Sequence, residues 1–140
     1  MAITGNQIQA PREIILGQIV AKANNYIAVP DGQGGKRIIK SDRVRGYEKS
    51  FARQCKTYKG ANIRRPFTLD VVIWYRNNRY DLDNSIKTLL DCLQYVGAIA
   101  DDNLCTRINA TKKVDALRPR VDFALIAEPE PPGLFTDDDF

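Results

Sequence analysis

Alternating apolar positions predict the strands of this chain. The clearest case spans residues 67–75, where every second residue is apolar: Phe67, Leu69, Val71, Ile73 and Tyr75. Val72 and Trp74 lie on the opposite face, so we expect this strand to be covered on both sides toward its end. Apolar-rich runs predict four further strands, at residues 12–20, 36–40, 104–114 and 120–127.

Two other segments repeat their apolar residues at helical spacing. Ser41 is a favourable N-cap for the first helix, which we expect to continue to about residue 58 on an apolar face made of Val44, Tyr47, Phe51, Cys55 and Tyr58. The second helix is expected to begin near Asp83 and to end before Gly97, with an apolar stripe at Ile86, Leu89, Leu90, Leu93 and Val96. Residues 21–36 are typical of a loop.

These elements predict a single compact α+β domain over residues 1–127, with four to five strands packed against two main helices. Residues 128–140 are rich in proline and acid and are expected to form an extended or disordered tail. Five of the 17 acids and none of the 21 bases lie in this tail, which leaves 12 acids against 21 bases in the body. That excess of positive charge slightly favours a polyanionic partner such as nucleic acid.

The composition excludes several classes of chemistry. The chain contains no histidine, which rules out Ser-His-Asp and Cys-His catalysis, histidine-ligated zinc and HNH-type nucleases. Cys55, Cys92 and Cys105 form no C-x-x-C pair, so we expect reduced thiols rather than a disulfide frame or a zinc site. No apolar stretch could span a bilayer, and the first residues lack the form of a signal peptide, so we expect a cytoplasmic protein that does not bind membranes.

Acidic residues flank the second predicted helix. Asp81 and Asp83 stand at its start, Lys87 lies one turn beyond Asp83, and Asp101-Asp102 follow its end. Carboxylates that converge in a fold require a neutralising cation, and carboxylate oxygens favour Mg²⁺ or Mn²⁺ over zinc or copper. We expect the strand after the helix to bring Asp101-Asp102 back to the end of the domain that carries Asp81 and Asp83. A metal held there would support phosphodiester hydrolysis, with Lys87 as a fixed positive charge beside the phosphate.

Each of these residues also has a structural interpretation. Asp83 or Asn84 would serve as an N-cap. Lys87 would form a solvated pair with Asp83 or Asp91, and Asp101-Asp102 would form a turn. A calcium-binding EF-hand is excluded, because its sixth and twelfth positions would be Ile86 and Cys92 instead of glycine and glutamate.

The acidic block resembles the RusA family of Holliday-junction resolvases. The family's hallmark is a D-x-D-N element, a lysine four residues after the second acid, a D-x-L helix, a glycine and a D-D pair. The corresponding residues here are Asp81-Leu82-Asp83-Asn84, Lys87, Asp91-Cys92-Leu93, Gly97 and Asp101-Asp102. The resemblance extends in order over about residues 12–127 and includes Asn24-Asn25-Tyr26. The family's prolines before these asparagines are absent here, and Ala21, Lys22 and Ala23 stand in their place.

The resemblance implies a Mg²⁺-dependent endodeoxyribonuclease, with Mn²⁺ as a substitute, that resolves four-way DNA junctions by paired symmetrical nicks in DNA recombination and repair. It implies a RusA-like fold with a mixed β-sheet, a homodimer, and a bacterial or phage-type host. It assigns catalysis to Asp81, Asp83, Lys87 and Asp102. It assigns metal binding to Asp81, Asp83 and Asp102, with Asp101 as a supporting acid.

Two further features bear on partners. The basic residues expected to contact DNA phosphates are Arg76, Arg79, Lys36 and Arg37, and Tyr80 would either stack on an unpaired base or pack on the core. The tip Asp137-Asp138-Asp139-Phe140 would either solubilise the chain or bind a protein partner. Two other functions stay open at this point: a metal nuclease for other branched DNA or RNA, and a non-catalytic DNA-binding protein.

Overall fold

The computed structural model describes residues 10–21 and 26–129. Its centre is a four-stranded mixed sheet in the order β1-β6-β4-β5. The strands are β1 (Glu13–Leu16), β4 (Phe67–Tyr75), β5 (Cys105–Val114) and β6 (Arg120–Ala127). Strand β6 is antiparallel to both β1 and β4, whereas β4 and β5 are parallel. The predicted α+β fold with a mixed sheet is therefore confirmed. Within the described residues, no helix is long and apolar enough to cross a membrane.

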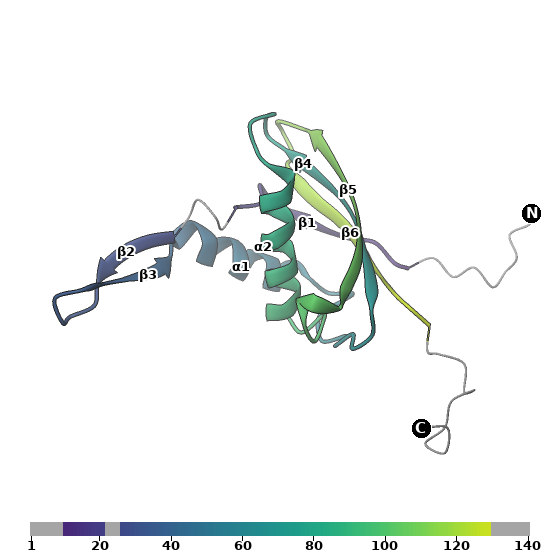
Figure 1. The fold of residues 1–140 in the computed structure, drawn as a ribbon. Helices are drawn as coiled ribbons and strands as arrows, with labels where there is room; N and C mark the ends of the chain where they lie inside the picture. The colour runs from purple at the N-terminus through teal and green to yellow at the C-terminus, as the bar shows by residue number, and fades with distance from the viewer. Residues whose placement is uncertain (1–9, 22–25, 130–140) are drawn as a thin grey trace, which may run out of the picture.

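Both helices, α1 (Asp42–Gln54) and α2 (Leu82–Tyr95), lie on one face of this sheet (Figure 1). The alternation in β4 produces that arrangement, since its residues alternate strictly between buried and half-buried positions. The apolar faces predicted for the two helices are buried against the same sheet face, and together they form one core cluster. Ser41 caps α1 as expected, because its side chain accepts a hydrogen bond from the amide of Val44 at 3.4 Å.

Helix α1 ends at Gln54, before the predicted limit at residue 58. The reason is the buried carboxylate of Glu13, which accepts hydrogen bonds from the amides of Lys56, Thr57 and Tyr58. These amides therefore bond to β1 instead of extending the helix. Burial alone would raise the pKa of Glu13, but the three amides and the Cys55 thiol lower it below its ordinary value.

The three cysteines are free, as expected. Burial, together with the hydrogen bond and negative charge of Glu13, raises the pKa of Cys55 to about 12. This thiol is therefore protonated and unreactive at neutral pH.

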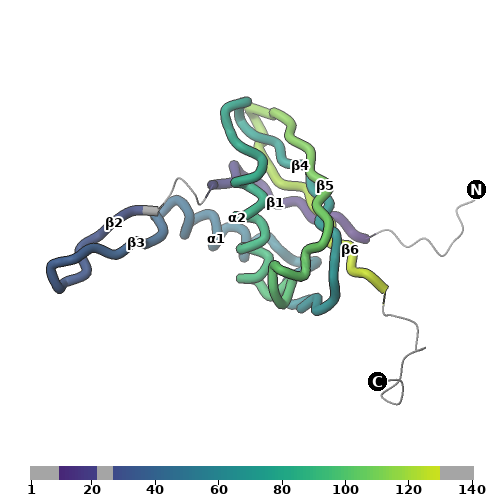
Figure 2. Tube along the Cα trace, in the orientation of Figure 1, coloured from purple at the N-terminus to yellow at the C-terminus, as the bar shows by residue number. Residues whose placement is uncertain are grey.

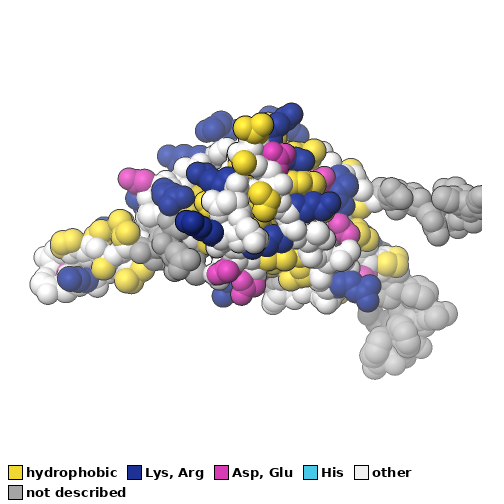
Figure 3. Space-filling view, turned by 90° about the horizontal axis from the view of Figure 1, so that it is seen from above, with side chains coloured by type: hydrophobic (Ala, Val, Ile, Leu, Met, Phe, Trp, Pro, Cys, Tyr) yellow, Lys and Arg dark blue, Asp and Glu magenta, His cyan; other side chains and the backbone are white. Residues whose placement is uncertain are grey.

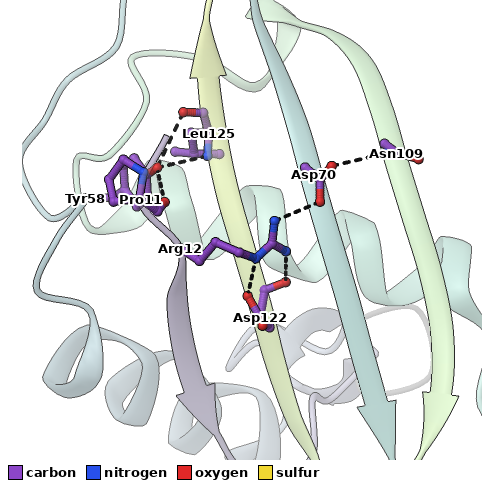
Figure 4. A network of polar contacts seen from close by, with 7 residues as sticks. All are labelled: Pro11, Arg12, Tyr58, Asp70, Asn109, Asp122 and Leu125. Carbon is purple, nitrogen blue, oxygen red and sulfur yellow. Dashed lines mark hydrogen bonds and ion pairs between the residues drawn. The ribbon is translucent and has the colours of Figure 1, made fainter. Parts of the chain in front are cut away.

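The opposite face of the sheet is covered by polar side chains instead of a second layer. Arg12 bonds to Asp122 on β6 and Asp70 on β4, at 2.6 and 2.9 Å, and Asn109 on β5 donates to Asp70 at 3.0 Å (Figure 4). The network thus ties residue 12, just before β1, to the other three strands. Trp74 is half-buried on this face under the guanidinium of Arg120, which lies 4.0 Å from its ring centre. The expected cover on both sides of β4 is thus supplied by long charged side chains.

A two-stranded sheet projects from this body as an arm (Figures 1 and 2). It pairs β2 (Tyr26–Pro30) with β3 (Lys36–Lys40). The strand at 36–40 was predicted, but β2 falls in the segment assigned to a loop, because its Ala-Val-Pro end weakens the strand pattern. Ile27 and Ile38 are 46% and 68% exposed, so the arm has little core of its own.

The connection from β4 through α2 to β5 determines where the acidic residues lie. Because β4 and β5 are parallel, the helix must carry the chain back from the end of β4 to the edge of the sheet where β4 began. The start of α2 therefore lies beside the ends of β4 and β5, near Tyr75 and Val114. The end of α2 lies beside their starts, near Phe67 and Cys105.

Candidate active site

The turn between β4 and α2 presents two carboxylates. Asp81 occupies the N-cap position of α2, but its side chain makes no capping hydrogen bond. Its main-chain carbonyl accepts from the amide and hydroxyl of Ser85, at 3.3 and 3.0 Å, which starts the helix without the carboxylate. The Asn84 amide donates to the Asp81 carboxylate at 3.4 Å. Both Asp81 and Asp83 are exposed. The N-cap interpretation therefore does not account for either carboxylate.

Lys87 lies one helical turn beyond Asp83 and is exposed. Both residues line the same groove between α2 and β5. Within the described ranges, Lys87 forms no ion pair with Asp83, so the interpretation as a simple helix pair is not supported. The ammonium group is thus available to another negative group that enters the groove.

Aromatic residues support this turn from beneath. The hydroxyl of Tyr75 donates to Ser85 at 2.6 Å, and the Ser85 hydroxyl in turn donates to the carbonyl of Asp81. Burial raises the pKa of Tyr75, and the negative charges of Asp81 and Asp83 raise it further against the opposing hydrogen bond with Ser85. The ring of Tyr80 stacks on Tyr75 with 5.4 Å between centroids, so it packs on the core in this chain.

Asp101 and Asp102 form a separate acidic group at the other end of α2. Asp101 caps a short 3₁₀ turn, η2 (Asp102–Leu104), by accepting from the amide of Asn103 at 2.9 Å. The amide of Asp102 donates to Gln94 in the last turn of α2 at 3.2 Å. A hydrogen bond with Asp101 raises the pKa of Asp102, and burial and the charges of Asp101 and Asp91 add to that rise.

The expectation that all four acids meet within one chain is wrong. A helix of 14 residues is roughly 21 Å long, and the two acidic groups lie at its opposite ends. The physical reason is the parallel β4–β5 pairing, which returns the chain to the start of β4 instead of its end. Within residues 10–21 and 26–129, no three His, Cys, Asp or Glu side chains are grouped closely enough to hold a metal ion. The four carboxylates are exposed, so solvation by water is enough to stabilise their charges in the single subunit.

Positive charge surrounds the Asp81–Asp83 end. Exposed Lys and Arg side chains gather on the face seen from above in Figure 3, at the end of the sheet where β4 leads into α2. Arg76 and Arg79 are exposed in the β4–α2 turn, and Arg118 is exposed in the adjacent β5–β6 turn. Lys36 and Arg37 are exposed on β3 of the projecting arm, apart from this group. The two groups of predicted DNA contacts therefore lie on different parts of the molecule.

Sequence reasoning missed the role of three residues that hold the turn: Tyr75, Ser85 and Lys112. Tyr75 was expected only as a core residue. Ser85 is buried beside the apolar stripe of α2, and Lys112 lies on the core-facing side of β5 in register with Ile73. The available signal was the pattern itself. Ser85 and Lys112 are polar residues at positions where the period of the helix or strand requires an apolar one.

Comparisons with known proteins agree with the acidic block. A family model described as Endodeoxyribonuclease RusA matches residues 17–125. A curated protein from Aquifex aeolicus (strain VF5), named Crossover junction endodeoxyribonuclease RusA, is 31% identical over 106 residues. That alignment covers 74% of this chain and 81% of the relative.

Proposed function

Because this chain belongs to the RusA family of endodeoxyribonucleases, we propose that it resolves four-way DNA junctions as a Mg²⁺-dependent homodimer. One observation carries the finer part of this proposal. The two halves of the acidic motif lie at opposite ends of α2, near the two ends of the β5 edge, which pairs with no further strand among the described residues. A second copy of the chain on that edge would bring the missing carboxylates to each half of the motif.

Strand β5 is the longer of the two edge strands in the described sheet. Among the described strands, β5 pairs with β4 alone, so none of them bonds to the outer side of its ten residues. A groove of about 650 Å³ follows the same edge between β5 and α2, and its walls are mainly apolar: Leu82, Ile86, Leu90, Ile108 and Ala110. Ile108 is 47% exposed there, and Tyr95 on α2 is 64% exposed. An apolar groove beside an open edge is typical of a surface that pairs with another chain.

Two-fold symmetry brings the acidic groups together. If two β5 edges pair antiparallel about a two-fold axis, the start of one β5 lies opposite the end of the other. The start of β5 follows Asp102, and its end lies beside the turn that carries Asp81 and Asp83. The two α2 helices then run antiparallel on the same face. Asp81 and Asp83 of one subunit therefore approach Asp102 of the partner subunit, and two equivalent sites form.

The donor set fits magnesium by its chemistry. Asp81, Asp83, Asp101 and Asp102 offer only carboxylate oxygens, the hard ligands that Mg²⁺ and Mn²⁺ prefer. Such an ion, when bound with a phosphodiester, lowers the pKa of a water and offsets charge on the phosphate. Within the described part of one chain too few of these oxygens lie together, so the fit depends on the proposed dimer.

The remaining residues act on the DNA. Lys87 supplies a positive charge to the phosphate that enters the groove beside Asp83. Arg76 and Arg79 bind neighbouring phosphates, which orients the strand without reading its sequence. A dimer presents these groups twice, which suits a junction with two symmetry-related strands.

A direct test incubates the purified protein with a synthetic four-way junction and Mg²⁺, with Mn²⁺ in a parallel series. The proposal predicts paired nicks at symmetrical positions and none in EDTA. Flap, fork, duplex and RNA substrates run side by side decide the specificity. Equal cleavage of all substrates would contradict junction resolution and would indicate a general nuclease instead. Tight junction binding without any nicking would instead indicate a non-catalytic DNA-binding protein.

A further inference from the structure

The ammonium group of Lys112 holds the turn that carries Asp81. Its Nζ donates to the main-chain carbonyls of Asn78 and Tyr80, at 3.1 and 2.6 Å. The same group lies 5.7 Å from the ring centre of Tyr75. Lys112 is half-buried, and it belongs to the strand whose free edge is the proposed dimer contact. A lysine placed this way satisfies carbonyls that would otherwise turn to water.

The turn is held from a second side by the helix. The carbonyl of Asp81 accepts from Ser85, and Tyr75 donates to Ser85. The carbonyls of residues 78, 80 and 81 are thus all engaged by β4, β5 or α2. With its main chain held on this inner side, the turn exposes the carboxylates of Asp81 and Asp83 on the other.

We propose that Lys112 is a positioning residue for the cleavage reaction, which holds the Asp81 turn in the geometry that a metal-binding site requires. This rests on the junction-cleaving function proposed above. Lys112 contacts neither carboxylate and acts through the main chain of residues 78–80. Outer residues that orient ligands in this way typically change metal affinity or activity by about 10- to 100-fold.

The neighbouring residue provides a matched control. Lys113 carries the same charge on the same strand, but its side chain lies on the opposite face, 5.9 Å from the ring centre of Trp74. Lys113→Met therefore removes one positive charge without releasing the turn. Any loss shared by the two variants reflects charge alone.

The first test measures amide hydrogen exchange by mass spectrometry, without DNA or metal. For Lys112→Met we expect exchange in residues 76–81 to rise about tenfold or more, whereas Lys113→Met leaves it unchanged. Unchanged exchange in Lys112→Met would overturn the proposal. If Lys112→Met does not fold, Lys112→Gln replaces it. This variant loses the charge and has a shorter side chain, and we expect amide exchange in residues 76–81 to rise at least about threefold.

The second test compares single-turnover nicking of a four-way junction, its dependence on Mg²⁺ concentration, and junction affinity in EDTA. Lys112→Met is expected to nick about 10- to 100-fold more slowly and to require more Mg²⁺, with the junction affinity of Lys113→Met. Lys112→Arg, which keeps two donors and the charge, restores most of the rate. A loss confined to affinity would overturn the positioning role. If the wild-type protein does not nick, the proposed function fails, and the exchange experiment still decides whether Lys112 holds the turn.

Discussion

Asp81 lies at the start of a helix, where the side chain of an aspartate usually caps the first backbone amides. Here the carboxylate makes no capping bond, and Ser85 engages the backbone carbonyl instead. The spacing of Asp83 and Lys87 is a local property of one helix, and the structure places both residues on the same groove. The sequence did not reveal that Tyr75 and Lys112 support them, because those contacts join distant segments.

Asp81→Asn separates the chemical role from the structural one. We expect the free energy of unfolding to fall by less than about 1 kcal/mol, the usual cost of a lost N-cap, because no capping hydrogen bond is lost. Junction affinity should persist, whereas nicking in Mg²⁺ should fall by at least about 10²-fold, because an amide is a poorer magnesium ligand than a carboxylate. Asp42→Asn, in the first turn of α1, is the matched control and should nick normally. Normal nicking by Asp81→Asn would remove it from the site.

Glu13 gives the fold its acid sensitivity. Its pKa is lowered in the folded chain, so its stabilisation is complete above the unfolded-state pKa of about 4.3 and is lost as the pH falls through the folded-state value. Glu13→Gln should reduce the free energy of unfolding at pH 7 by about 1–3 kcal/mol, because buried amides lose a charged acceptor. Urea titrations between pH 3 and 7 should show a weaker pH dependence in the variant. An unaltered pH dependence would contradict this role.

At the scale of elements, local periodicity was a good guide. It located β4, β6 and both helices, because each buries one face against a common core, and it also located β5, although no residue of that strand is fully buried. It did not show whether β5 pairs parallel or antiparallel with β4, and that choice decides where Asp102 lies. Register and direction are set by the length of the crossover and by neighbouring strands, which no single segment encodes.

The free edge of β5 supports a prediction about assembly. Ile108→Lys places a charge in the apolar groove and should convert the proposed dimer to a monomer with little nicking. Ile126→Lys is the control, because Ile126 has nearly the same exposure, 45% against 47%, but lies on β6. Analytical ultracentrifugation measures both. A dimer that survives Ile108→Lys but not Ile126→Lys would move the interface to the other side of the sheet.

At the scale of the whole molecule, one group of exposed Lys and Arg side chains lies at the end that carries the Asp81 turn (Figure 3). For Arg79→Ala we expect weaker junction binding, and a plot of log affinity against log salt whose slope falls by about 0.9 per lost phosphate contact. Arg53→Ala, exposed on α1 away from the turn, should leave the slope unchanged. Equal effects of the two substitutions would show that Arg79 contributes only to overall charge.

The acidic tip at residues 137–140 lies outside the described residues, and its proposed protein partner stays a prediction.

A composite site across two subunits has a consequence that a site within one subunit cannot share. Asp81→Asn and Asp102→Asn are each expected to be inactive alone. In a mixed dimer one site receives both substitutions and the other receives neither, so one intact site returns. The decisive measurement mixes the two variants, confirms mixed dimers by native mass spectrometry, and follows nicking of a four-way junction. Recovery to about one quarter of wild-type nicking is the predicted result, since about half of the dimers are mixed and each has one intact site. Confirmed mixed dimers with no recovered nicking would contradict the composite site.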